Sequence, residues 1–109
     1  MKYLTKITGG TLTAYFDCEL DHCSAGKVRD DLDKKITDPS VKRIIFDLSK
    51  LNFMDSTGIG LLLGRYKLAK SRGIELFIAD PDENVSKILK LSGIFSIISV
   101  IDSRGVYGK

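Results

Sequence analysis

The sequence lacks the features that mark secreted and membrane-spanning proteins. Its 109 residues contain no tryptophan, one histidine, two cysteines and two prolines. No apolar run approaches the ~20 residues that a helix needs to cross a bilayer, and the first residues do not resemble a signal peptide. With so few cysteines, a disulfide-stapled secreted domain is not expected. We therefore expect a cytoplasmic protein that does not associate with membranes.

The scarce metal-binding residue types are clustered, which requires a metal site to be considered. Cys18, His22 and Cys23 lie close together in the sequence. A structural zinc site uses about four ligands, and the chain offers no further cysteine or histidine. Cys18 also falls on the apolar side of an expected strand, where a free thiol packs as a small hydrophobic group. We expect no metal, no cofactor and no Cys18–Cys23 disulfide.

The net charge of the chain is also small. The formal net charge is +3 and the lysines and arginines are scattered, so the sequence has no basic cluster of the kind that binds nucleic acid. The chain has no low-complexity tract and no internal repeat, and 43% of its residues are hydrophobic. This length and composition predict one globular domain over residues 1–109.

Hydrophobic periodicity predicts an α/β fold. Leu12, Ala14 and Phe16 alternate with polar residues, which is typical of a strand with one buried face. Ile44, Ile45 and Phe46 are contiguous, which favours a central strand covered on both faces. The segments expected as strands are 3–8, 11–20, 41–48, 74–79 and 97–101. The expected helices are 25–36, one that runs from the cap residues 55–57 to about residue 71, and 81–92.

Several segment boundaries carry local signals. Gly9 and Gly10 suit a two-residue hairpin turn between the first two strands. Gly73 and Gly93 are placed to end the second and third helices. Asp80 is expected as the N-cap of the third helix, with Pro81 at its first position.

The element order ββαβαβαβ predicts a mixed sheet whose parallel strands are joined by right-handed helical crossovers. The carboxyl ends of the parallel strands then lie along one edge, which is where such sheets carry their sites. Asp21, Ser56 and Asp80 each follow directly on such an end. Asp21 and His22 are therefore expected near Ser56, although they are distant in the sequence.

The start of the second helix is the most distinctive stretch. Asp55, Ser56 and Thr57 can each accept hydrogen bonds from the free N–H groups of a first turn. Gly58 and Gly60 are costly inside a helix, but they allow another backbone or a phosphate to approach closely. Ser56 is therefore either an ordinary capping serine or a serine displayed for modification by a partner.

The residues FMDSTGIG at 53–60, followed by LLLGRYKLAK at 61–70, resemble the signature of the STAS-domain anti-sigma factor antagonists, with the sporulation branch as the nearest. ELDH at 19–22 and LSGIF at 91–95 are similar to further segments of that family. The resemblance implies a STAS fold and a protein that is not an enzyme. It also implies that Ser56 is phosphorylated by an anti-sigma factor that is a serine kinase, and dephosphorylated by a separate serine phosphatase.

The same resemblance implies roles for the neighbouring residues. Asp55 would orient Ser56, and Thr57, Gly58 and Gly60 would lie in the partner-binding surface. Asp21 and His22 would contribute to the same docking edge. The unphosphorylated form would bind the anti-sigma factor and free the sigma factor.

Three departures from the family pattern, and one alternative function, stay open. Cys18 stands where the family has a glycine, and Cys23 where it has a histidine. Residues 102–109 are short and contain glycine where relatives have a further helix. The alternative is a small nucleotide-binding or nucleotide-hydrolysing enzyme that uses the same edge.

Overall fold

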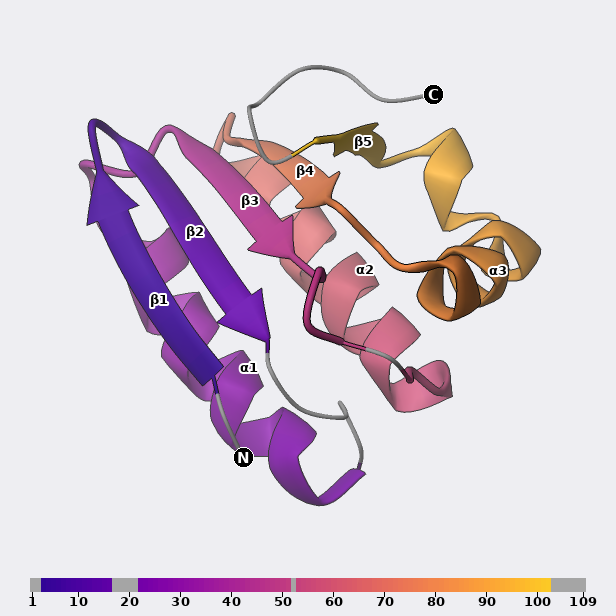
Figure 1. Ribbon diagram of the computed structural model, residues 1–109. Helices are drawn as coiled ribbons and strands as arrows, with labels where there is room; N and C mark the ends of the chain where they lie inside the picture. The colour runs from indigo at the N-terminus through magenta and orange to yellow at the C-terminus, as the bar shows by residue number, and fades with distance from the viewer. Residues whose placement is uncertain (1–2, 17–21, 52, 103–109) are drawn as a thin grey trace.

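The computed structural model describes residues 3–16, 22–51 and 53–102, with only the backbone for 22–25. Five strands and three α-helices alternate along it in the predicted order (Figure 1). The strands are β1 (Tyr3–Thr8), β2 (Thr11–Phe16), β3 (Arg43–Asp47), β4 (Glu75–Ala79) and β5 (Ser99–Ile101). The helices are α1 (His22–Ile36), α2 (Ser56–Ser71), α3 (Glu83–Ser92) and the short 3₁₀ helix η1 (Ile94–Ser96).

The strands form one mixed sheet in the order β1-β2-β3-β4-β5. β1 and β2 pair antiparallel through the predicted hairpin, whose Gly9 and Gly10 have φ angles of 57° and 81°. These left-handed conformations suit glycine, which has no Cβ to clash. The other three pairings are parallel, so the carboxyl ends of β2, β3 and β4 lie along one edge, as predicted.

One face of the sheet carries the main hydrophobic core. α1 and α2 lie side by side behind the sheet in Figure 1. The predicted alternation in β2 is confirmed, because Leu12, Ala14 and Phe16 are buried. Ala14 aligns with Phe46 of β3, which aligns with Ile78 of β4, and both partners are fully buried. Removing such contiguous apolar surface from water is the main favourable term in folding.

The opposite face of the sheet is less completely covered at β3 than predicted. Ile44 and Phe46 point into the main core, but Ile45 between them is only partly buried. Ile45 packs on the opposite face against a small cluster that includes Phe77 and Ala79. The run of three apolar residues in β3 therefore serves two hydrophobic clusters of unequal size.

The predicted start of the third helix is wrong. α3 begins at Glu83, and its N-cap is Asp82, whose Oδ1 accepts a hydrogen bond from the Val85 N–H at 2.8 Å. Asp80 instead has a left-handed φ of 51°, and its N–H donates to the Ile101 carbonyl at 3.2 Å. That bond ties Asp80 to the end of β5, so the helix starts later.

The other element ends differ by a few residues from those predicted. Helix α2 has Arg72 as its C-cap, with Gly73 directly after it at φ 70°, whereas Gly93 is the C-cap of α3, as predicted. β5 is shorter than the expected strand 97–101, because the N–H groups of Ile97 and Ile98 both donate to the Ile94 carbonyl of η1. Residues 17–20 of the expected second strand lie outside the described residues. Within the described ranges, none of the helices is both long and apolar enough to cross a membrane.

A buried ion pair joins the two helices of the main core. The Arg65 side chain of α2 is only 10% exposed, and its Nε lies 2.8 Å from Oδ1 of Asp33 on α1, whose side chain is 40% exposed. The contact is an ion pair rather than an aligned hydrogen bond, since neither atom has a hydrogen-bond partner. Burial lowers the pKa of Arg65, and the charge of Asp33 opposes that shift.

Because Arg65 is more deeply buried than Asp33, replacing one or the other should lower the free energy of unfolding by different amounts. Asp33→Ala leaves a buried cation without its partner and should lower the free energy of unfolding by about 1–3 kcal/mol. Arg65→Met keeps an apolar stem and leaves a carboxylate that water can reach, so it should cost less than about 1.5 kcal/mol. Urea denaturation at neutral pH measures both. An equal or reversed order would contradict the role of Arg65 burial.

Candidate functional site

The candidate site is the start of α2, where the chain leaves β3 and turns into the helix. Of the three predicted cap residues, Asp55 is the N-cap. Its Oδ1 accepts hydrogen bonds from the Thr57 N–H at 2.9 Å and the Gly58 N–H at 3.3 Å. The Asp55 carbonyl accepts the first helical bond from the Ile59 N–H. One side chain therefore satisfies two of the N–H groups that a helix start leaves free.

Ser56 is the first residue of α2, and it is exposed. Because Asp55 takes the capping role, the Ser56 hydroxyl is not needed to cap the helix. No hydrogen bond of that hydroxyl is found among the residues that the structure describes. The positive end of the helix dipole lies at this first turn, so the hydroxyl sits where added negative charge is tolerated. The geometry is that of a hydroxyl that another molecule can reach.

The neighbouring predicted residues have different surroundings. Thr57 is partly buried, and Gly58 is fully buried in the helix start. Gly60 is exposed, and a Cβ built there would meet no atom within 4 Å. Nothing in the described part of the chain therefore requires glycine at position 60, and the backbone there is exposed.

The sheet brings the starts of α1 and α2 to one end of the molecule. Figure 1 shows β2 and β3 pointing to the end at which both helices begin. The backbone of His22 opens α1 there. Asp21 and the side chain of His22, both predicted at this edge, lie outside the described residues. Their placement near Ser56 remains a prediction.

No metal site is found where side chains are described. Among those residues, no group of three or more His, Cys, Asp or Glu could hold a metal ion. The side chains of Cys18, His22 and Cys23 are not among them. The chemistry available at the start of α2 is that of a hydroxyl beside a carboxylate.

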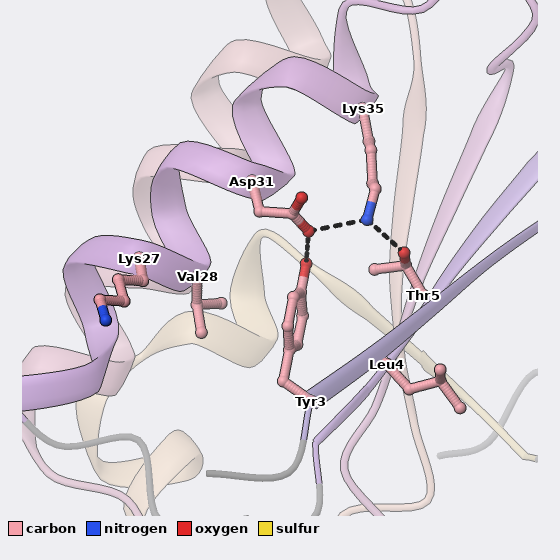
Figure 2. Close-up of a pocket in the computed structure, with 7 residues that line it drawn as sticks. All are labelled: Tyr3, Leu4, Thr5, Lys27, Val28, Asp31 and Lys35. Carbon is pink, nitrogen blue, oxygen red and sulfur yellow. Dashed lines mark hydrogen bonds and ion pairs between the residues drawn. The ribbon is translucent and has the colours of Figure 1, made fainter.

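A separate hollow of about 370 Å³ lies between β1 and α1 (Figure 2). Its polar groups satisfy one another: the Tyr3 hydroxyl donates to Asp31 Oδ2 at 2.9 Å, and Lys35 Nζ donates to the same oxygen at 2.8 Å and to Thr5 at 2.6 Å. The Lys35 hydrogen bond is the main reason that the pKa of Asp31 is lowered. Burial, with Asp31 nearby, raises the pKa of Tyr3. This network fastens the edge strand to α1.

Comparison with known proteins agrees with the resemblance of the sequence. Residues 2–106 match the STAS domain family. The anti-sigma F factor antagonist of Paenibacillus polymyxa is 37% identical over 95 residues, which cover 87% of this chain and 81% of that protein. The chain belongs to the STAS domain family, in the branch of the anti-sigma factor antagonists.

Solved structures of one such antagonist have the same fold. The anti-sigma factor antagonist SpoIIAA in its unphosphorylated form superposes with a TM-score of 0.82 at 27% identity, over 94% of this chain and 88% of that one. The Bacillus cell fate determinant SpoIIAA in its phosphorylated form gives 0.76 at 26% identity, over 94% and 91%. These names describe a regulator and not an enzyme, which agrees with the prediction for this chain.

The capping role of Asp55 predicts how its substitutions behave. Asp55→Ala should lower the free energy of unfolding by about 0.5–2 kcal/mol, whereas Asp55→Asn should cost little because asparagine caps equally well. Asp82→Ala, at the N-cap of α3, is the matched control and should cost a similar amount. Chemical denaturation of the four proteins tests this. If Asp55→Asn costs as much as Asp55→Ala, the charge of Asp55 matters more than its hydrogen bonds.

The Asp31 network predicts a dependence of stability on pH. Because the pKa of Asp31 is lower in the folded protein than in the unfolded chain, where it is ~3.9, ionised Asp31 stabilises the fold. This stabilisation is fully present above the unfolded pKa and is lost as the pH falls through the folded pKa. Since the side chain is 39% exposed, the contribution should be at most about 1 kcal/mol. The difference in unfolding free energy between wild type and Asp31→Asn should therefore shrink as the pH falls from about 5 through the lowered pKa of Asp31. Asp30→Asn, which removes an exposed charge from α1, should show a much smaller change.

Proposed function

We propose that this protein is a phosphorylation-switched anti-sigma factor antagonist. In its unphosphorylated form it binds an anti-sigma factor, and the sigma factor held by that partner is released. The anti-sigma factor is also a serine kinase, which transfers the terminal phosphoryl group of ATP to the Ser56 hydroxyl. A serine phosphatase removes the phosphate, and the cycle takes place in the cytoplasm.

The observation that carries this proposal is the exposed Ser56 hydroxyl beside a neighbour that already caps the helix. A serine used for capping would have its oxygen bound to the first-turn amides, but Asp55 occupies those of Thr57 and Gly58. The membership of the chain in a branch that includes a protein solved in both phosphorylation states gives independent support.

Electrostatics explain how one phosphate can switch binding without unfolding the domain. A phosphoserine carries about −1.5 to −2 charges at neutral pH. At the first position of α2 this charge is favoured by the helix dipole, by roughly 0.3–1 kcal/mol. The carboxylate of Asp55 is the adjacent side chain and already holds two amides. The added phosphate therefore makes a strongly acidic patch at the surface that the partner must cover.

The phosphate should therefore weaken the complex with the partner and leave the stability of the domain nearly unchanged. An interface that accepts a neutral hydroxyl would have to desolvate the phosphate, with no basic group provided for it. A penalty of roughly 3–5 kcal/mol weakens binding by about 10²–10³-fold or more. We assign Asp21, His22, Asp55 and Thr57 to the same docking surface. The exposed, bare backbone at Gly60 gives the partner close access to this helix start, whereas Gly58, which we also place beneath this surface, is buried.

Phosphorylation by the anti-sigma factor tests this function. Incubation with that kinase and ATP should add one phosphate to the wild type and to Thr57→Ala, and none to Ser56→Ala, as measured by intact mass. Thr57→Ala is the matched control because Thr57 carries the nearest competing hydroxyl. A phosphate retained by Ser56→Ala, or mapped to Thr57 by peptide fragmentation, would contradict the assignment of Ser56.

A further inference from the structure

Phe53 is exposed in a way that no other described phenylalanine is. It lies in the loop between β3 and α2 and is 44% exposed. Phe16, Phe46 and Phe77 are at most 6% exposed, and Phe95 is partly buried against the core. Phe53 lies close in sequence to the candidate binding site, where an aromatic side chain can supply a large apolar contact to a partner.

Leu51 before Phe53, and Met54 and Asp55 after it, are held by the fold. Leu51 and Met54 are each 1% exposed and belong to the main core. Asp55 follows directly and is held by its two capping hydrogen bonds. The ring is therefore presented by an anchored segment, so little conformational entropy remains to be lost when it binds.

Chain geometry places Phe53 within the area that a kinase at Ser56 must cover. Three residues span at most about 10–11 Å, so the two Cα atoms are no farther apart than that. A standard protein interface buries about 800 Å² on each partner, which corresponds to a patch of roughly 16 Å radius. A partner centred on the Ser56 hydroxyl therefore extends past the position of Phe53.

We propose that Phe53 is an aromatic anchor that inserts into an apolar pocket on the anti-sigma factor. This inference rests on the proposed function and adds a contact that does not depend on charge. Buried aromatic side chains near the centre of an interface carry a disproportionate share of its affinity. Phe53 contributes to affinity in either phosphorylation state, whereas the phosphate on Ser56 decides whether the complex forms.

The loss of affinity expected for Phe53→Ala follows from the exposed area of the Phe53 side chain. A phenylalanine side chain buries on the order of 200 Å² when fully covered, so its exposed part is roughly 90 Å². At about 25 cal/mol per Å², covering that area corresponds to about 40-fold in affinity. Phe53→Ala should therefore weaken binding of the unphosphorylated protein by about 10- to 50-fold. Phe53→Leu, which keeps most of the apolar area, should stay within about three-fold of wild type.

Leu4→Ala provides the matched control. Leu4 is 66% exposed on the edge strand β1, which β2 separates from β3 in the sheet, and its truncation should change affinity less than two-fold. Binding to the anti-sigma factor by calorimetry, with thermal melting of each variant, separates affinity from folding. In the kinase assay, Phe53→Ala should raise KM and leave kcat unchanged, because the ring does not touch the reacting atoms.

The outcomes separate this inference from the proposed function. If the wild type binds the anti-sigma factor and Ser56 is phosphorylated, but Phe53→Ala binds like wild type or no worse than Leu4→Ala, the anchor is wrong and the function stands. If the wild type does not bind, both are wrong. If Phe53→Ala dissociates a homodimer in sedimentation while its affinity for the anti-sigma factor is unchanged, the ring belongs to a contact between copies of this chain, and the anchor is again overturned.

Discussion

The hydrogen bonds from the Asp55 carboxylate to the first turn of α2 fix what the rest of the site can do. They determine where the helix begins, and so they make Ser56 its first residue. They also occupy the amides of Thr57 and Gly58, which a serine or a phosphate would otherwise bind. The same side chain thus stabilises the helix start, leaves the hydroxyl accessible and supplies the charge that a phosphate would lie beside.

The sheet gives this helix start a rigid support. α2 packs on the same face as α1, and the Arg65–Asp33 ion pair joins the two helices through the core. The edge strand is in turn fastened to α1 by the Tyr3, Asp31 and Lys35 network. A domain anchored in this way can present a switch residue without itself changing shape. Under the proposed function, its response to a phosphate on Ser56 would be an electrostatic one at its surface.

The sequence predicted the fold well, because the strands and helices have strong hydrophobic periods. The alternation in β2 and the glycine turn before it are local signals that tertiary contacts did not override. Asp80 was misassigned because Asp80 and Asp82 are both good caps. The choice was made by a hydrogen bond from Asp80 to Ile101, which is distant in sequence. Burial of Arg65 was not predictable for a similar reason, since its partner lies on another helix.

The start of α2 was predictable in its location but not in its details. The three adjacent cap candidates are equivalent in sequence, and only the backbone geometry selects Asp55. Phe53 has a large apolar side chain of the kind usually found in the core, and only the structure shows that it is exposed. No described residue lies within 4 Å of a Cβ built at Gly60, so packing within the described part of the chain does not explain a glycine there.

Amide NMR spectra of the unphosphorylated and Ser56-phosphorylated protein test the central claim, which is that the phosphate acts as a surface charge on an unchanged fold. The account predicts chemical-shift changes concentrated around Asp21 and residues 53–62, with the signals of β2, β3 and β4 unmoved. Shifts spread across the sheet would contradict it, because they would mean that phosphorylation reorganises the domain.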